Sequence, residues 1–451
     1  MSATTLLSVR QASALIARRE TSSHNLVDGC LARIAQFEDR VHAWVQVDAD
    51  GARAQAARLD AELANGQSRG PLHGIPMGVK DIIDVAGLPT LGGSPLRAGH
   101  VAERDAAIVG RLREAGAVIL GKTVTTQFAS FDPPPTHNPW DLGRTPGGSS
   151  SGSAAAVAIG MCLAAIGSQT GGSITRPAAY CGVAGCKPTL GRVSLDGILP
   201  LSFHMDHPGP IAHEVADLAM LLSVLAGYEA GDPFSVNAPA EDYAQSLSIS
   251  APPRLRVLTG FFQDAASADV RQSVDAAVQT LRDAGATVDF APPPPSFATV
   301  IASHRTVMAV DAAMHHREHF PARRDQYGPQ IGSLLDEGNA AHRLDYAAAL
   351  MHRKHFTHEL ERLMEGCDAL VTPAATTTAP TSETTGDPRF NAPWSFAGVP
   401  TVCFPCGLGA DGLPIGLQLI SRRWSEAGLL AASWWCQQKI GFAAQPRLLA
   451  E

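Results

Sequence analysis

One local pattern recurs along the chain, a helix that ends in glycine and leads at once into a short apolar strand. Residues 109–116 form such a helical stretch, and residues 117–120 (AVIL) have the composition of a buried strand. The same layout returns at residues 278–285 and 286–290. Further strands are expected at residues 254–258, 369–371, 401–404 and 415–420. Helices that alternate with short apolar strands are typical of α/β proteins with a mostly buried sheet, so we predict that fold class.

The chain is expected to form one large domain across residues 1–451. Helical periodicity dominates its first part, and we divide the domain into N-terminal helices (1–66), a core (67–230), and a variable helical part with C-terminal strands (231–451). Residues 231–253 and 381–393 have the composition of loops. Neither loop is long or polar enough to be an interdomain linker.

Charge and hydropathy restrict the partners of the protein. The net charge is −8, and the sequence contains no block of lysine and arginine that would indicate nucleic-acid binding. The longest apolar stretch, residues 154–166, is too short and too rich in alanine to span a bilayer. The N-terminus lacks the pattern of a signal peptide. We therefore expect a cytoplasmic protein, monomeric or homodimeric, without nucleic-acid or membrane partners.

Residues 116–123 (GAVILGKT) satisfy the P-loop pattern but not its physical requirements. A P-loop needs a flexible segment whose amides bind phosphate. Here the middle residues favour a buried strand. We therefore expect a structural strand, with Lys122 in a loop after it.

Residues 315–319 (HHREH) fit a zinc-binding pattern. On a helix, His315 and His319 would lie one turn apart, with Glu318 as a general base. However, the segment is polar on all sides, and Phe320 and Pro321 end the helix immediately. A solvated helix end is the preferred interpretation, and a metallohydrolase remains as an alternative function.

Residues 148–152 (GSSSG) fit the nucleophile motif of α/β-hydrolases around Ser150. That motif must follow a buried strand. The preceding residues, HNPWDLGRTP, cannot form one, so the α/β-hydrolase interpretation fails.

A serine needs a base to act as a nucleophile at neutral pH, and no histidine flanks the serine-rich segments. A lysine can serve if burial lowers its pKa. Lys80 lies in GIPMGVKDIID, at the end of an apolar stretch that favours a strand. Taken alone, Lys80 is more simply a strand-end lysine that extends to water. Ser173 lies in QTGGS, where adjacent glycines permit close approach of the backbone to a ligand.

Taken together, these segments resemble the amidase signature family. The resemblance rests on the segments GIPMGVKDIIDVAGLPTLGGS, GRTPGGSSSGSAAAVAIG, GSQTGGSITRPAAYCGVAGCKPTLGRVS, HPGPIAHEVADLAMLLSVLAG, CDALVTPAA and FAGVPTVCFPCGLGADGLPIGLQLI, in this order along the chain. It covers most of the sequence and is weakest between residues 231 and 365. It implies the amidase signature fold, a central mixed β-sheet covered on both faces by helices.

The resemblance also implies a Ser-Ser-Lys catalytic site. Ser173 matches the nucleophile, Ser149 matches the bridging serine that follows a cis peptide bond, and Lys80 matches the terminal base. The backbone amides of Thr170, Gly171, Gly172 and Ser173 match the oxyanion hole. The implied reaction is hydrolysis of the C–N bond of small-molecule amides through an acyl-enzyme, with carbamates and esters as further candidate substrates. No metal or cofactor is expected.

Two positions depart from the common family pattern. Gln169 stands where many members have aspartate, and Arg176 comes three residues after the nucleophile, whereas many members have an arginine two residues after it. This version resembles the malonamidase-like branch, in which the matching arginine binds a substrate carboxylate. Arg176 is therefore either a substrate anchor or a residue that braces the loop through a buried carboxylate. The same departures count against an ammonia-channelling component of an aminoacyl-tRNA amidotransferase, which remains an alternative function.

The pocket walls are less constrained by the sequence. Residues 128–137 (FASFDPPPTH) lie close in sequence to Ser149 and form a stiff segment that is a candidate border of the site. Phe131, Phe203, His204 and Trp394 are candidate wall residues. A wide apolar mouth would suit aryl amides, anilides or carbamates, and a small pocket anchored by Arg176 would suit short amido acids.

Overall fold

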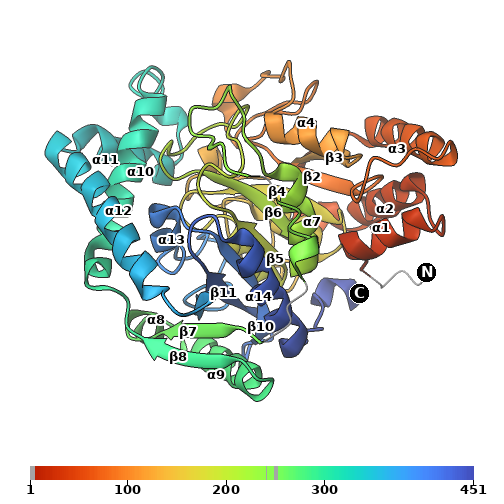
Figure 1. The fold of residues 1–451 in the computed structure, drawn as a ribbon. Coiled ribbons are helices and arrows are strands. Elements are labelled where there is room, and N and C mark those ends of the chain that lie inside the picture. Colours follow the sequence, from red (N-terminus) through yellow and green to blue (C-terminus); the bar gives the residue numbers. More distant parts are fainter. Residues whose placement is uncertain (1–5, 240, 248–251, 451) are drawn as a thin grey trace.

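The computed structural model describes residues 6–239, 241–247 and 252–450 (Figure 1). The described residues form one sheet of eleven strands, in the spatial order β1-β3-β2-β4-β6-β5-β10-β11-β9-β7-β8. The strands are β1 (Trp44–Val47), β2 (Pro76–Lys80), β3 (Val118–Thr123), β4 (Ala164–Gln169), β5 (Ala184–Lys187), β6 (His207–Ala212), β7 (Arg254–Leu258), β8 (Thr287–Ala291), β9 (Ala369–Pro373), β10 (Thr401–Leu408) and β11 (Pro414–Ile420).

Helices flank this sheet, which confirms the predicted α/β class (Figure 1). They are α1 (Val9–Ala17), α2 (Ser23–Val41), α3 (Ala49–Ala64), α4 (Ala107–Glu114), α5 (Ser151–Ala158), α6 (Thr175–Cys181), α7 (Val215–Leu225), α8 (Phe261–Asp264), α9 (Ala268–Asp283), α10 (Val300–His316), α11 (Pro329–Ala340), α12 (Arg343–Leu363), α13 (Ala392–Ala397) and α14 (Glu426–Ile440). In Figure 1, α10, α11 and α12 lie together on the side of the molecule opposite α1, α2 and α3.

The sheet is mixed. β2 runs parallel to both β3 and β4, and β7 runs parallel to β8 and β9. β6 is antiparallel to β4 and β5, and β10 is antiparallel to β5 and β11. The strands β2, β3 and β4 are buried along their whole length, as expected for parallel strands covered on both faces. Their carboxyl ends therefore meet at one edge of the sheet.

A short strand interrupts the N-terminal region for which helical periodicity predicted helices alone. β1, with the sequence WVQV, lies between α2 and α3 and pairs antiparallel with β3. Aromatic and β-branched side chains favour a strand, and the open edge of β3 supplies the pairing partner. Tertiary pairing therefore overrides the helical pattern over these four residues.

Two further lysines are buried at strand ends. Lys122 belongs to β3, so its expected position in a loop after that strand is wrong, and it lies 3.2 Å from a carboxylate oxygen of Asp81. Lys187 ends β5 and donates to the carbonyl of Val399. Burial lowers the pKa of Lys187 to about 7. The fold therefore holds cationic side chains in its core by placing backbone carbonyls or a carboxylate beside them.

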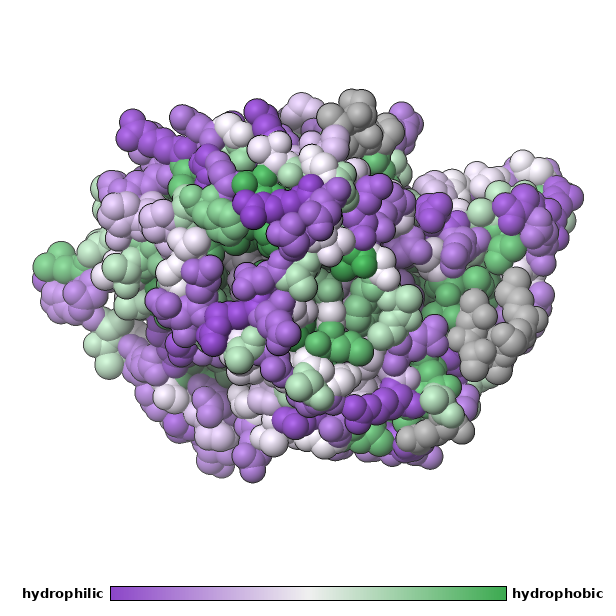
Figure 2. Space-filling model, turned by 90° about the horizontal axis from the view of Figure 1, so that it is seen from below, coloured by the Kyte–Doolittle hydropathy of each residue, from purple (hydrophilic) through white to green (hydrophobic). Residues whose placement is uncertain are grey.

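The surface of the protein carries both hydrophobic and hydrophilic residues. Seen from below, hydrophobic residues lie in small groups among hydrophilic ones (Figure 2). No helix of the described residues combines the length and the apolar character that crossing a membrane requires.

Candidate active site

Lys80 is the last residue of β2 and is fully buried. Its Nζ lies 2.7 Å from Oγ of Ser149 and 2.8 Å from Oγ of Ser168. Ser168 belongs to β4, the parallel neighbour of β2, in the register that pairs Val79 with Ile166. The sheet thus brings Lys80 and Ser168 together at the carboxyl edge of adjacent strands, and a loop places Ser149 beside them.

The surroundings of Lys80 favour a neutral amine. Burial lowers the pKa of Lys80 to about 7, and the negative charge of Asp206 opposes part of this effect. An amine with this pKa is largely deprotonated at mildly alkaline pH. It can then accept a proton from a hydroxyl within hydrogen-bonding distance.

Ser149 lies in a loop whose backbone is closely packed. The peptide bond between Gly148 and Ser149 is cis, and Ser149 is fully buried. A Cβ atom at Gly148 would lie 2.9 Å from the side chain of Thr385, so a side chain at this position would crowd its neighbours. The carbonyl of Gly148 accepts a hydrogen bond of 2.7 Å from Nη2 of Arg176. A larger residue at position 148 would have to displace the side chain of Thr385, and Arg176 fixes the orientation of the peptide.

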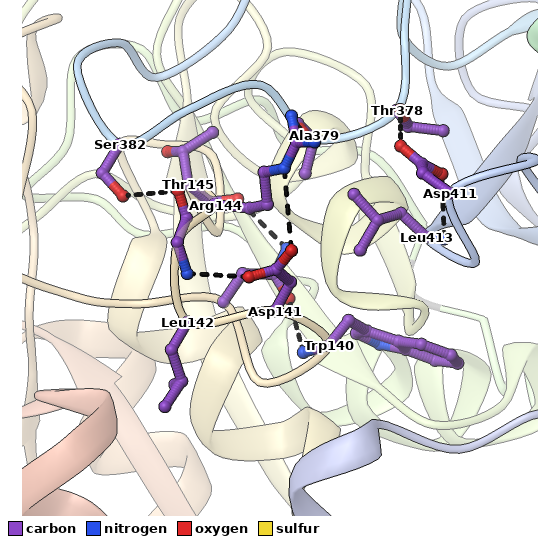
Figure 3. A network of polar contacts seen from close by, with 12 residues as sticks. Trp140, Asp141, Leu142, Arg144, Thr145, Thr378, Ala379, Ser382, Asp411 and Leu413 are labelled. Carbon is purple, nitrogen blue, oxygen red and sulfur yellow. Dashed lines mark hydrogen bonds and ion pairs between the residues drawn. The ribbon is translucent and has the colours of Figure 1, made fainter.

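A polar network anchors the chain just before this loop (Figure 3). Oδ1 of Asp141 accepts from the amide of Gly143, and Nη1 of Arg144 donates to the carbonyl of Ala379 over 3.4 Å. The amide of Thr145 donates to the carbonyl of Pro380 over 2.9 Å. These contacts fasten residues 141–145 to the segment that follows β9, and so set where the serine loop begins.

The other serines of the GSSSG segment have structural partners. Oγ of Ser150 donates to the carbonyl of Ser168 over 3.2 Å, and the amide of Ser168 donates to the same Oγ over 3.2 Å. Oγ of Ser151 donates to the carbonyl of Gly147 over 2.7 Å at the start of α5. Ser150 and Ser151 therefore hold the loop in place, and Ser149 is the serine that contacts the lysine.

Ser173 lies in the loop between β4 and α6. Its carbonyl accepts a hydrogen bond of 3.3 Å from the amide of Ser150, which places the loop of Ser149 beside that of Ser173. Ser173 is 8% exposed, whereas Ser149 and Lys80 are 0% exposed. Of the three residues, Ser173 is the one that a molecule from solvent reaches first.

The backbone around Ser173 leaves its amides available. Within the described part of the chain, the N–H groups of Gly171, Gly172 and Ser173 donate to no protein acceptor. The carbonyls of the same loop are instead occupied, that of Thr170 by Nε2 of His304 at 3.0 Å and that of Gly171 by Oγ of Ser395 at 3.0 Å. Fixed carbonyls and free amides form a backbone geometry suited to binding an oxyanion.

Gln169 organises the turn after Ser173. Its Oε1 accepts from the amides of Ile174 and Thr175, both over 2.9 Å. Its Nε2 donates to Oγ of Ser395 over 3.3 Å. A neutral amide side chain thus caps the start of α6 and connects it to α13.

Arg176 is buried behind the loop of Ser173. Its Nε donates to the carbonyl of Thr385 over 2.7 Å, and its Nη2 donates to the carbonyl of Gly148. The partners are carbonyl and hydroxyl oxygens and not the buried carboxylate considered from the sequence. Its Nη1 has no hydrogen-bond partner and is itself buried. A Cβ at Gly172 would lie 3.0 Å from this Nη1.

The candidate wall residues separate into two groups. Trp394 is fully buried and stacks on Phe262, so it is a core residue and does not form an exposed wall. Phe131 and Phe203 are half-buried. Phe131 faces Arg305, and Phe203 stacks on Phe234.

A cavity of about 630 Å³ lies beside the segment FASFDPPPTH. Its lining includes Thr126, Gln127, residues 133–135 and Tyr327. A Cβ at Gly148 would lie 3.2 Å from the methyl group of Thr126. The proline segment therefore borders a cavity next to the loop of Ser149.

The metal-site alternative gains no support from the geometry. α10 ends at His316, so His315 and His319 do not lie on one helix, and both are exposed together with Glu318. The buried histidine is His316, whose Nδ1 lies 3.1 Å from the hydroxyl of Tyr327. Among the described residues, no group of three or more histidines, cysteines or acidic residues is placed to hold a metal ion.

Sequence reasoning missed several residues that the fold brings to the site. Ser168 contacts Lys80, His304 and Ser395 hold the loop carbonyls, and Asp206 lies near Lys80. Ser168 had a signal, because it is a polar residue at the end of a buried strand. His304 and Ser395 had none, because they reach the site from α10 and α13, far along the chain.

Comparisons with known proteins agree with this geometry. Residues 25–430 match the family described as Amidase. The putative amidase AmiD of Mycobacterium tuberculosis is 36% identical over 457 residues, which cover 97% of this chain and 94% of that protein. A component of the glutamyl-tRNA(Gln) amidotransferase of Anaeromyxobacter sp. is 36% identical over 474 residues, covering 96% of each chain.

Solved structures show the same fold. A protein of a vestigial complex, studied for the evolutionary origins of an s-triazine catabolic enzyme, has a TM-score of 0.92 and 32% identity, covering 97% of this chain and 100% of that one. The peptide amidase of Stenotrophomonas maltophilia has a TM-score of 0.86 and 31% identity, covering 98% of each chain. The protein therefore belongs to the amidase signature family and is a hydrolase that acts on amides.

Proposed function

We propose that the protein hydrolyses the C–N bond of small neutral amides with Ser173 as nucleophile, Ser149 as proton bridge and Lys80 as base. The observation that carries the proposal is the buried contact of 2.7 Å between Nζ of Lys80 and Oγ of Ser149. A buried lysine whose polar contacts are two serine hydroxyls has no ion-pairing role to fill. Its lowered pKa suits it to accept a proton.

The reaction then runs in two halves. Neutral Lys80 takes the proton of Ser149 as Ser149 takes that of Ser173, and Oγ of Ser173 forms a bond to the carbonyl carbon. The C–N bond breaks as the proton returns through Ser149 to the leaving amine, which leaves an ester on Ser173. Water then adds to the ester with the same base, and the C–O bond to Ser173 breaks to release the acid.

The oxyanion of each tetrahedral intermediate would bind the loop that carries the nucleophile. The amides of Gly171, Gly172 and Ser173 are available for it, and the amide of Thr170 completes the set expected from the family. Removing one such donor typically lowers kcat by about 10²- to 10³-fold. The contacts of His304 and Ser395 with the loop carbonyls support this role, because they fix the peptide planes before substrate binds.

The contacts of Arg176 favour a neutral substrate over an amido acid. Two of its three nitrogen atoms already bind backbone carbonyls, and the third is enclosed. A guanidinium held in this way braces the peptide of Gly148 and does not present two free nitrogen donors for bidentate binding of a substrate carboxylate. Carbamates and esters share the carbonyl chemistry of amides and would be further substrates of the same site.

A matched set of substrates tests this proposal. We expect an acetanilide and an aryl carbamate to be hydrolysed with kcat/KM at least about tenfold above that of the malonyl half-amide of the same aryl amine, since two of the three nitrogen atoms of buried Arg176 already bind backbone carbonyls. Release of the aryl amine is followed by absorbance, with Ser173→Ala as the blank. A preference for the half-amide would contradict the neutral-substrate proposal and make Arg176 a substrate anchor.

The pH dependence tests the base. Because Lys80 must be deprotonated to act, and its pKa is about 7, we expect kcat/KM to rise with pH through about 7 and then level off. The profile is measured with a neutral amide, whose own charge does not change. A rate that falls steadily between pH 7 and 9 would contradict the role of Lys80.

A second candidate function is that of one component of an ammonia-channelling amidotransferase. The similarity to a component of the glutamyl-tRNA(Gln) amidotransferase favours it. Amide hydrolysis by the purified single chain distinguishes the two functions. A channelling component would show little activity by itself and would co-purify with other proteins of such an assembly.

A further inference from the structure

A buried carboxylate, that of Asp206, lies next to the proposed catalytic groups without a part in the reaction described above. Asp206 is 6% exposed and immediately precedes β6. β4 and β6 pair antiparallel, and Gln169 lies opposite His207. The same register brings Thr170, the residue after Gln169, opposite Asp206. The sheet therefore places this carboxylate beside the loop of the nucleophile.

The contacts of Asp206 follow from that placement. Oγ1 of Thr170 donates to Oδ1 of Asp206 in a short hydrogen bond. The other carboxylate oxygen, Oδ2, accepts from the amides of Leu201 and Ser202, over 2.8 and 3.1 Å. Hydrogen bonds to an ionised acceptor are about twice as strong as those between neutral groups. Asp206 thus joins the 201–206 turn to the first residue of the nucleophile loop.

Asp206 also lies close to Lys80 in the sheet, because Nζ of Lys80 contacts Oγ of Ser168, and Ser168 lies opposite Pro208, two residues after Asp206. Asp206 is the charged group that raises the pKa of Lys80 against the effect of burial. Burial raises the pKa of Asp206 itself to about 6, and nearby Asp311 adds to this, while its three hydrogen bonds oppose it. Asp206 is therefore ionised above about pH 6, over the range in which Lys80 would act as a base.

We propose that Asp206 is a positioning residue of the reaction, which fixes the nucleophile loop through Thr170 and supplies the counter-charge for Lys80 when the relay protonates it. This inference rests on the proposed function. When Lys80 accepts the proton of Ser149, a positive charge forms in a fully buried site. An isolated buried cation is unstable, and a fixed negative charge nearby stabilises it.

The surrounding charges do not already cancel that of Asp206. Asp311, a carboxylate near Asp206, is bridged to it through Ser202, whose amide binds Asp206 and whose hydroxyl binds Asp311 over 2.6 Å. Asp311 has its own partners in His204, with Nδ1 at 3.0 Å, and the hydroxyl of Tyr346 at 2.9 Å. Asp206 has no cationic partner among the ion pairs of the described residues, which leaves its charge to act on Lys80.

Four variants separate the two parts of this role. Asp206→Asn removes the charge, Asp206→Glu keeps the charge but alters its position, and Thr170→Val removes the hydroxyl while retaining the shape of the side chain. Asp217→Asn is the matched control, because Asp217 is also a fully buried carboxylate, but its contact is the amide of Arg10 at 2.9 Å. Thermal unfolding of each variant shows which of them fold.

The readout is the pH profile of kcat and kcat/KM for a neutral amide, together with the rate at which a serine-directed sulfonyl fluoride labels Ser173. For Asp206→Asn we expect the acid limb to move down by about one pH unit and kcat to fall about tenfold or more, since the protonated lysine has lost its counter-charge. For Thr170→Val and Asp206→Glu we expect a lower kcat, with the acid limb of the pH profile at the same pH as in the wild-type protein. Asp217→Asn should retain the wild-type kcat and the wild-type position of the acid limb.

An unmoved acid limb in folded Asp206→Asn would overturn the counter-charge role. A wild-type kcat in Thr170→Val would overturn the positioning role, and this variant and Asp206→Glu keep the proposal testable if Asp206→Asn does not fold. Ser173→Ala in the same assays tests the reaction itself. If Ser173→Ala retains activity, the proposed function fails, whatever the Asp206 variants show.

Discussion

Ser173→Ala is expected to lower amide hydrolysis by about 10⁴- to 10⁶-fold, because it removes the proposed nucleophilic oxygen. The fold should survive, since the described part of the chain gives the Ser173 hydroxyl no hydrogen-bond partner to lose. The measurement is kcat with a neutral anilide, beside thermal unfolding of the same preparation. A stable variant with unchanged kcat would contradict the nucleophile assignment.

Ser151→Ala is the matched control for this change. Ser151 lies in the serine-rich segment of residues 148–152, beside the loop of Ser173, and is also buried, but its hydroxyl donates to the carbonyl of Gly147. We therefore expect Ser151→Ala to act through stability, by about 1 kcal/mol for a lost internal hydrogen bond, and to leave the pH profile unchanged.

Lys80→Met has the second-largest expected effect, a loss of about 10³- to 10⁴-fold in kcat. Methionine keeps an unbranched side chain in the buried site but cannot accept a proton. Because the proposed proton relay ends at Lys80, both formation and hydrolysis of the proposed acyl-enzyme should slow. Measured between pH 6 and 10, the residual activity should lack the limb near pH 7 that the wild-type lysine produces.

Lys122→Met controls for the removal of a buried lysine. Lys122 belongs to the neighbouring strand β3, but it contacts Asp81 and the carbonyl of Pro89 and not the serines. Its loss leaves Asp81 without its cation, so we expect reduced stability and a retained pH profile. Equal activity losses in Lys80→Met and Lys122→Met would contradict the specific role of Lys80.

The α/β class and several strands could be predicted from local patterns alone. The strand 254–258 was predicted with the bounds that it has in the structure, because apolar residues there are bounded by a proline pair and a turn. β1 could not be predicted in the same way, since a four-residue strand is defined by its partner β3 and not by its own sequence. Local propensity is a weak guide wherever pairing over long sequence distances decides the structure.

The residues of the candidate site were likewise predictable only where the local sequence carries a signal. Lys80, Ser149 and Ser173 carry signals in glycine-rich or strand-end segments, and the structure brings Lys80 to Ser149 and the loop of Ser149 to that of Ser173. The sequence could not decide whether Arg176 anchors a substrate or braces the loop. Its partners, Gly148 and Thr385, come together only when distant loops fold. Asp206 had no signal of its own, because its importance comes from the pairing of β4 with β6.

Two buried lysines couple folding to proton release. Lys80 and Lys187 each have a pKa of about 7 in the folded protein, against 10.5 for an ordinary lysine. Between these two pH values the unfolded chain binds more protons than the folded chain, so folding there releases up to one proton from each lysine. The contribution of this pair to the free energy of unfolding therefore rises with pH from about 7 to 10.5. Alkaline conditions that deprotonate Lys80, the proposed base, thus also relieve the cost of burying it.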